Sequence, residues 1–249
     1  MGYVLSLFAT LSLLLAMGCA TPGSRPAPTQ AVKAADTPVT SAPVERPANL
    51  ELPAGAAQAP AAFEGEGWQA MFDGQTLAGW RETPFAGHGE VHCQDGVLVL
   101  NMGDPFTGVN YTNEFPRVNY EVALDAMRIM GSDFFCGLTV PVGTNCCSLI
   151  VGGWGGSLIG ISSVDGMDAS ENETTKYANF QNGRWYRIRL RVTEKKLEGW
   201  IDQEKLINVD LTGRRITVRP GDIELSQPMG VAAWQSTAAL REIKFRRLE

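Results

Sequence analysis

Residues 63–249 predict an all-β domain folded as a two-sheet antiparallel sandwich. Short alternating or apolar runs recur there, separated by the Gly, Asn and Asp residues that mark turns. All six Trp residues of the chain lie in this part, and no stretch of it has a convincing helical pattern. Many short strands with frequent turns are typical of a sandwich, because each sheet needs a second sheet to cover its apolar face.

The predicted strands follow one another along the whole domain. They are Trp68–Phe72, Val97–Met102, Asn119–Met130, Phe134–Val140, Cys147–Gly152, Ser157–Ser162, Trp185–Val192, Leu197–Asp202, Lys205–Asp210, Met229–Trp234 and Ala239–Leu248.

The clearest strand is Trp185–Val192, because every second residue from Tyr186 onward is apolar and faces one side. The other side carries Arg187, Arg189 and Arg191. The next strand can place Glu198 and Asp202 close to these arginines. We therefore predict cross-strand ion pairs on a solvated face, with ligand binding as the alternative.

Residues 1–18 have the properties of an export signal. Val4–Met17 is almost entirely apolar or small, and it is shorter than the roughly 20 residues that span a bilayer. The segment ends in small residues directly before Cys19, which resembles the lipobox of bacterial lipoproteins. The resemblance implies lipidation of Cys19 and a firm membrane anchor made of several acyl chains. The alternative is an ordinary signal peptide followed by a chance cysteine.

The residue after Cys19 bears on where the protein is located. Ala20 stands where an Asp would retain a diderm lipoprotein at the inner membrane, so we expect an exported protein of the cell envelope, anchored at the outer membrane. Residues 19–62 are rich in Pro and Ala and contain no aromatic residue, which predicts a disordered tether. Fully extended at about 3.1 Å per residue, such a tether reaches on the order of 130 Å.

Charge and composition exclude two classes of function. The net charge of −6 argues against a nucleic-acid partner, which needs a basic face. The chain has only two histidines, His88 and His92, so a three-histidine metal site is excluded.

Several motifs of the domain resemble one family. Gly67–Trp80 is similar to the opening signature of the bacterial 3-keto-disaccharide hydrolase domain, and Gln94–Leu98 is similar to its next turn. Gly183–Asp202 resembles a hairpin that this family shares with laminin-G and concanavalin A-like sandwiches, and Leu240–Phe245 resembles the closing strand. The resemblance implies a concanavalin A-like jelly-roll of two antiparallel sheets, and cleavage of 3-keto glycosides.

The centre of the domain departs from the family pattern. Typical members have a strand with a Glu and a Gln where this chain has Cys146–Trp154, and a His near the position of Met229–Thr237. None of these three residues is present. The fold expectation does not depend on them, but fold alone does not establish function.

Two sets of residues are candidates for binding. Trp154 is flanked by four glycines, so the backbone beside it can approach a ligand closely. Because aromatic rings stack on the apolar faces of sugars, Trp80, Trp154, Trp234 and Gln235 are candidate carbohydrate-binding residues. The alternative is that these rings fill the core or a sheet bend.

A loop after residue 162 concentrates oxygen ligands. It carries Asp165, Asp168, Glu171 and Glu173, a composition that suits Ca²⁺, with a polar surface loop as the alternative. Cleavage of a 3-keto glycoside needs one base, because the ketone acidifies the adjacent C–H bond. The candidate catalytic residues are Asp165, Asp168, Glu171 and His92.

Four cysteines remain beyond Cys19, and no pattern assigns them a catalytic role. Cys146 and Cys147 are adjacent, so they point to opposite faces of a strand. Export permits disulfides, but the sequence does not choose among the three connectivities.

Two functions of different classes follow from these residues. One is a tethered carbohydrate-active enzyme that cleaves 3-keto glycosides. The other is a non-catalytic module that binds glycans or another surface through its Trp residues. The two differ in whether the carboxylates of the 165–173 loop share one cleft with Trp154 and Trp234.

Overall fold

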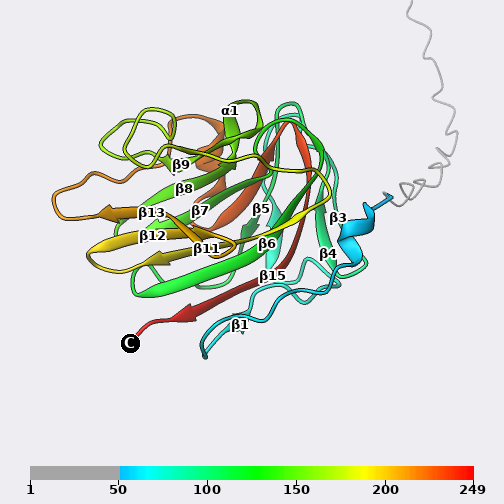
Figure 1. Ribbon diagram of the computed structural model, residues 1–249, viewed down its shortest axis with the longest axis horizontal. Helices are drawn as coiled ribbons and strands as arrows, with labels where there is room; N and C mark the ends of the chain where they lie inside the picture. Colours follow the sequence, from blue (N-terminus) through cyan, green and yellow to red (C-terminus); the bar gives the residue numbers. More distant parts are fainter. Residues whose placement is uncertain (1–50) are drawn as a thin grey trace, which may run out of the picture. The chain divides into compact units, whose positions relative to one another are not determined.

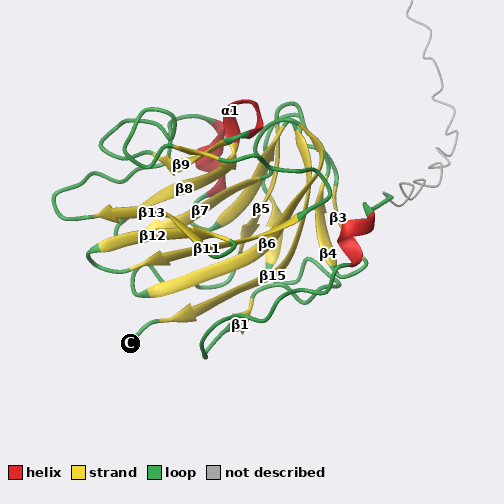
Figure 2. Ribbon diagram, in the orientation of Figure 1, coloured by secondary structure: helices red, strands yellow, loops and turns green. Residues whose placement is uncertain are grey.

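The computed structural model describes residues 51–249, and these residues form two stacked antiparallel sheets (Figures 1 and 2). The all-β sandwich prediction is confirmed. The predicted signal peptide (1–18), the lipidation of Cys19 and the first part of the tether lie outside the described residues. Within residues 51–249, no helix has the length and apolar character needed to cross a membrane.

One sheet has eight strands in the order β13-β12-β11-β6-β15-β4-β3, with β1 paired to β15. The bounds are β1 Gln69–Ala70, β3 Val91–Gln94, β4 Val97–Leu100, β6 Tyr120–Gly131, β11 Trp185–Val192, β12 Lys196–Ile201, β13 Glu204–Asp210 and β15 Ser236–Arg247.

The other sheet has seven strands in the order β10-β9-β8-β7-β14-β5-β2. The bounds are β2 Trp80–Glu82, β5 Phe106–Tyr111, β7 Cys136–Val142, β8 Asn145–Gly152, β9 Leu158–Ser162, β10 Lys176–Tyr177 and β14 Gly230–Trp234. Three short helical segments complete the described part of the chain: η1 Ala54–Ala57, α1 Gly153–Gly156 and η2 Asp222–Ser226.

Every predicted strand corresponds to an observed one, and β11 has the predicted bounds. The predictions omit β2, β3, β5 and β10, for which there are two physical reasons. The strands β2, β3 and β10 are short and lie at sheet edges. β5 contains Gly108, where a Cβ atom would lie 2.9 Å from the carbonyl oxygen of Val231 on the neighbouring strand. Close packing between backbones therefore replaces the side-chain pattern of an ordinary strand.

The main core lies between the two sheets, and β11 shows how the sequence pattern builds it. Its apolar positions from Tyr186 to Val192 are buried, as the alternation predicts. Cys147 belongs to this core, whereas Cys146 belongs to a second cluster on the outer face of the seven-stranded sheet. The predicted opposite orientation of the two cysteines is confirmed, and the four cysteines of the described part are free thiols.

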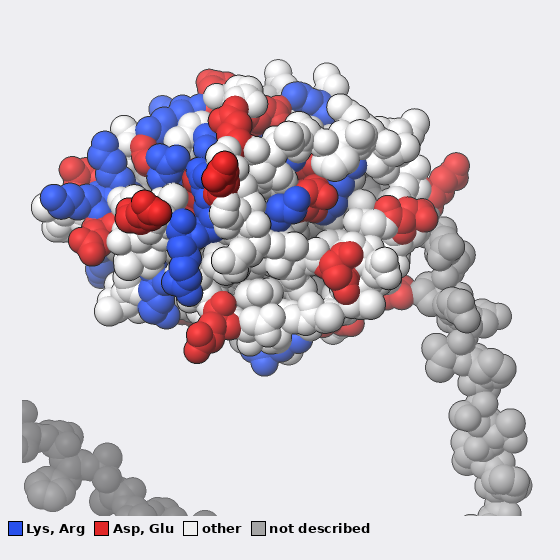
Figure 3. All heavy atoms as spheres, turned by 90° about the horizontal axis from the view of Figure 1, so that it is seen from below, with Lys and Arg blue, Asp and Glu red and all other residues white. Residues whose placement is uncertain are grey.

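The arginine face of β11 covers two buried carboxylates of β6. Glu121 is completely buried, and its oxygens lie 3.0 Å from Arg189, 3.3 Å from Arg191 and 2.5 Å from Arg246. Asp125 is similarly buried and pairs with two further residues, Arg187 and Arg241. Figure 3 views the molecule from the side of β1 and β15 and shows basic groups gathered over part of this face.

The predicted cross-strand ion pairs are therefore present, but their main partners are on β6. Of the two acids predicted on the next strand, Glu198 lies 3.7 Å from Arg191, while Asp202 pairs with Arg184. The long-range pairing of β11 with β6 places Arg187 opposite Asp125 and Arg191 opposite Glu121. The sequence alone does not show which distant strand lies beside β11.

Residues 51–66 form a strap across the outer face of the eight-stranded sheet. Leu52 and Ala56 pack on the apolar cluster that contains Trp185, and the Arg241 guanidinium donates hydrogen bonds to the main-chain carbonyls of Ala56 and Gln58. The 51–62 part of the predicted disordered tether is therefore packed. Hydrogen bonds to the main-chain carbonyls of this segment hold it on the sheet. A pattern of side chains in the sequence does not reveal such bonds.

We expect Glu121→Gln to destabilise the domain by about 2–4 kcal/mol. The amide removes the negative charge that three arginines share, and its NH₂ group would face guanidinium N–H donors in place of an acceptor oxygen. Urea unfolding followed by tryptophan fluorescence measures this change. Glu114→Gln is the control, because Glu114 is exposed and its side chain has no partner within the described residues. Equal stabilities for the two variants would contradict the role given to Glu121.

Candidate functional site

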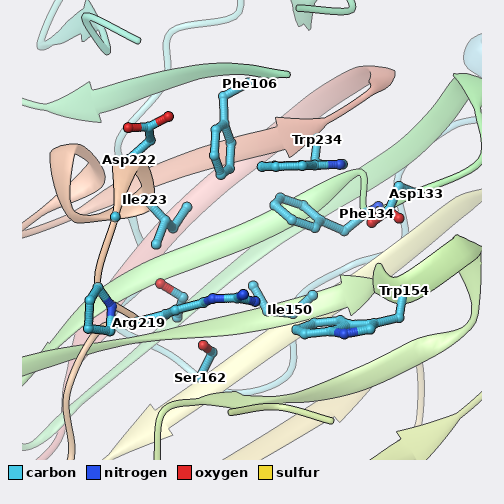
Figure 4. A pocket seen from close by; sticks show the side chains of 13 residues that line it. Phe106, Asp133, Phe134, Ile150, Trp154, Ser162, Arg219, Asp222, Ile223 and Trp234 are labelled. Atoms are coloured by element: carbon cyan, nitrogen blue, oxygen red, sulfur yellow. Dashed lines mark hydrogen bonds between the residues drawn. The ribbon is translucent and has the colours of Figure 1, made fainter. Parts of the chain in front are cut away.

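A cleft of about 480 Å³ opens on the outer face of the seven-stranded sheet (Figure 4). Strands β5, β8, β9 and β14 form its floor, and the α1 turn and the 219–223 segment form its rims. The lining residues are Phe106, Asp133, Phe134, Ser148, Ile150, Trp154, Ser162, Arg219, Pro220, Gly221, Asp222, Ile223 and Trp234.

One wall of the cleft consists of aromatic rings. Phe106 meets Trp234 edge to face, with ring centroids 4.5 Å apart, and lies 6.1 Å from the Phe134 ring. Phe85 stacks on Phe106 from behind at 4.7 Å. Because each ring is held by the next, this wall is a preorganised apolar surface.

Trp154 stands on a tight turn at another rim. Its own φ is +48°, and the flanking Gly152 and Gly155 have φ values of +80° and +85°, which glycine adopts without strain. Asp133 fastens this turn, since its Oδ2 accepts a 2.9 Å hydrogen bond from the Gly155 N–H group. The Trp154 side chain consequently stays 44% exposed, and its ring borders the cleft.

Arg219 and Asp222 bring charge to the cleft. Arg219 lies 5.8 Å from the Trp154 ring centroid, and its Nη1 is 2.6 Å from Asp168 Oδ2. Asp168 in turn accepts a hydrogen bond from the Ser162 hydroxyl. Asp222 is exposed and has no hydrogen bond or ion pair within residues 51–249.

The structure brings together two of the four predicted carbohydrate-binding residues, Trp154 and Trp234. Trp80 is only 5% exposed and belongs to the core between the sheets, where its Nε1 donates to the Met71 carbonyl. Gln235 is exposed, but it does not line the cleft. Trp80 is therefore a packing residue, which corresponds to the alternative interpretation of these rings.

The predicted catalytic carboxylates lie outside the cleft lining. Asp168 reaches it only through Ser162 and Arg219. Asp165 accepts hydrogen bonds from the main chain of Arg215 and the side chain of Arg214, which lower its pKa below the ordinary value of about 3.8. Glu171 is exposed and away from the lining.

The predicted Ca²⁺ site does not form in this loop. Arg214 binds Glu173 through two hydrogen bonds of 2.8 and 2.9 Å and also pairs with Asp165 at 2.6 Å. Within the described part of the chain, no group of three or more His, Cys, Asp and Glu is arranged to hold a metal ion. Asp165, Asp168 and Glu173 of this cluster therefore fasten the loop to arginines.

His92 lies on the other sheet. It is on β3 opposite Val99, and both of its ring nitrogens are buried without a hydrogen-bond partner in the described structure. Because the cleft lies on the outer face of the seven-stranded sheet, His92 is not placed to act there.

Several lining residues were not among the sequence candidates. Phe106 and Asp133 carry no motif, and Arg219 and Asp222 lie in a segment without strand or helix pattern. Phe134 was assigned only to a strand. Of the sequence candidates, the Gly-flanked Trp154 and Trp234 pointed to this cleft.

The match to a family model covers residues 67–249, and the model describes the 3-keto-alpha-glucoside-1,2-lyase-like domain. The chain belongs to this family. The resemblance seen in the opening motif is thereby confirmed, and the chain is a member of a carbohydrate-active domain family. No protein among the curated sequences matches it.

Solved structures resemble this lyase-like domain at low sequence identity. A candidate glycosyl hydrolase from Parabacteroides distasonis has 15% identity and a TM-score of 0.49, over 74% of this chain and 95% of the other. The Bacillus licheniformis β-glucanase has 7% identity and a TM-score of 0.48, over 75% and 100%. The carbohydrate-binding module CBM66 of Bacillus subtilis has 11% identity and a TM-score of 0.45, over 68% and 95%.

Strand β8 forms part of the cleft floor in this lyase-like domain. β8 lies where the family resemblance expects a strand with Glu and Gln, and it contributes Ser148 and Ile150 to the cleft. The Ser148 hydroxyl is hydrogen-bonded to Thr139 at 2.7 Å. This strand therefore offers no carboxylate as a base.

We expect the stabilising effect of Asp165 to depend on pH. Its pKa is lower in the folded protein, so its contribution is fully present above about pH 4 and is lost as the pH falls through the folded value. Urea unfolding of wild type and Asp165→Asn from pH 7 to pH 2 measures it. The two stabilities should converge at low pH. A constant gap for Asp165→Asn would contradict this assignment.

Proposed function

We propose that the domain binds a saccharide in the cleft, as the glycan-binding part of an envelope protein. The observation that carries this proposal is that Trp154 and Trp234 line one cavity, with Phe106 packed edge to face against Trp234. Sugar rings have apolar C–H faces that stack on such surfaces, while the polar groups at the rim pair with hydroxyls. Ser162, Arg219 and Asp222 supply donors and acceptors for this purpose.

Two observations favour binding over catalysis. The carboxylates Asp165 and Glu171 lie outside the cleft lining, and His92 is on the other sheet. The floor strand presents Ser148 and Ile150, neither of which can act as a general base near neutral pH.

We place this activity on an exported lipoprotein. The support is sequence alone: the apolar Val4–Met17 segment, the small residues before Cys19, and Ala20 in place of a retention Asp. A diacylglycerol on Cys19 with further acylation anchors the chain at the outer membrane. The saccharide partner is then a glycan outside the cell or in the envelope.

Trp154→Ala in the full-length chain should lower glycan affinity at least tenfold, because the exposed ring is the main stacking surface. A glycan array identifies ligands, and calorimetric titration measures their Kd values. Tyr177→Ala is the control, since Tyr177 is an exposed aromatic residue outside the cleft lining. Unchanged affinity for Trp154→Ala, or no glycan bound by wild type, would overturn the proposal.

Cleavage of 3-keto glycosides is the second candidate function, and two observations support it. The chain belongs to the lyase-like family, and Asp222 is a cleft carboxylate without a partner in residues 51–249. In such an elimination, the carboxylate takes the proton from the carbon beside the ketone. The electron pair forms a C=C bond while the glycosidic C–O bond breaks, and the aglycone leaves with that bond's electrons.

Incubation of the full-length chain with 3-keto glycosides and their unoxidised parents tests this candidate, with and without EDTA. If it is correct, the aglycone is released from the keto substrates alone, and Asp222→Asn abolishes the release. EDTA sensitivity reports whether a metal takes part. No release from any keto substrate would leave binding as the function of the cleft.

A further inference from the structure

The charges lining the cleft do not balance. The lining contains Asp133, Asp222 and Arg219, and Arg219 is already neutralised by Asp168, whose Oδ2 is 2.6 Å from Nη1. Asp133 and Asp222 have no ion pair among the described residues. The Arg128 guanidinium donates a 3.2 Å hydrogen bond to the Asp133 main-chain carbonyl and also interacts electrostatically with the Asp133 carboxylate. Asp222 therefore gives the cleft lining a negative charge that no ion pair of the described residues neutralises.

The two carboxylates differ in how free they are. Asp133 already accepts main-chain hydrogen bonds from Phe134 and Gly155 at 2.8 and 2.9 Å, so it holds the Trp154 turn in place. Asp222 sits in the first turn of η2 and has no hydrogen-bond partner in residues 51–249. Both of its oxygens are thus available to a ligand.

The aromatic walls favour the same kind of ligand. The face of an indole or phenyl ring attracts cations, and tryptophan does so most strongly. The Arg219 guanidinium near Trp154 shows that this rim accommodates a cation. Figure 4 shows Asp222 beside Phe106, on the side of the cleft where Trp234 also lies. A carboxylate next to aromatic rings is an arrangement that suits an ammonium group, and it repels an anionic sugar.

We infer that the cleft selects saccharides with a free amino group, with the ammonium bound to Asp222 and the sugar ring against the Trp residues. This inference rests on the proposed saccharide binding and names its ligand class, a hexosamine that is not N-acetylated. N-acetylation removes the charge and adds bulk at the nitrogen, and a hydroxyl in its place gives Asp222 only a neutral donor.

Three sugars that differ at one position test the inference. Glucosamine, N-acetylglucosamine and glucose are titrated into the full-length chain, together with the corresponding galactose series, and tryptophan fluorescence gives the Kd values. The amino sugar of at least one series should bind about five- to tenfold more tightly than its two partners. This preference should disappear at high salt and above the pKa of the sugar amine.

Variants locate the effect. Asp222→Asn should remove the preference, because the amide carries no charge, and Glu171→Gln, which removes an equal charge outside the cleft, should leave the preference intact. Equal or weaker binding of the amino sugars, with neutral sugars still bound through Trp154, would overturn this inference alone. If no sugar of either series binds, saccharide binding itself fails, and the inference fails with it.

Discussion

The eight-stranded sheet depends on the neutralisation of Glu121 and Asp125 in its outer layer. A buried carboxylate is tolerated only where donors surround it, and here five arginines from β11 and β15 supply them. These pairs connect β6 to both neighbouring strands and so favour one register, because a slip by one residue would turn the acids into the apolar core. The second sheet packs on the face that this register presents.

The cleft depends on a different kind of constraint, which is backbone geometry. Trp154 can stand exposed at the rim because glycines on both sides adopt positive φ and Asp133 accepts the Gly155 N–H group. A ring on a rigid turn binds a ligand without losing much conformational freedom on association. On the other wall, the edge-to-face packing of Phe106 against Trp234 also holds the rings rigid before a ligand binds. The polar groups are fewer, and they determine which saccharide these surfaces accept.

Periodicity was sufficient to predict the sandwich, since burial on one face imposes alternation on every long strand, as β11 shows. It was insufficient for edge strands such as β10, which bury little and carry no pattern. For the cleft, the glycines around Trp154 correctly indicated an exposed aromatic residue, which the structure places at the rim. Trp80 and the 165–173 carboxylates were equally good candidates for binding and catalysis on sequence grounds. The sequence does not show that the Trp80 ring faces the core, or that Arg214 forms ion pairs with the acids of the loop. Asp222 was not among the candidates, because only the folded structure places it in the cleft beside the aromatic residues.

The strap depends less on its own side chains than on the arginines that hold it. Arginines of the sheet hold it at the carbonyls of Ala56, Gln58, Ala61 and Glu66, and every amino acid has a carbonyl. Many substitutions in residues 57–62 would leave those bonds intact, whereas replacement of Arg187, Arg241 or Arg246 would remove them. The family model begins at residue 67, although packed structure is already present at residue 51. In this protein the packed structure therefore begins before the segment that the family match covers.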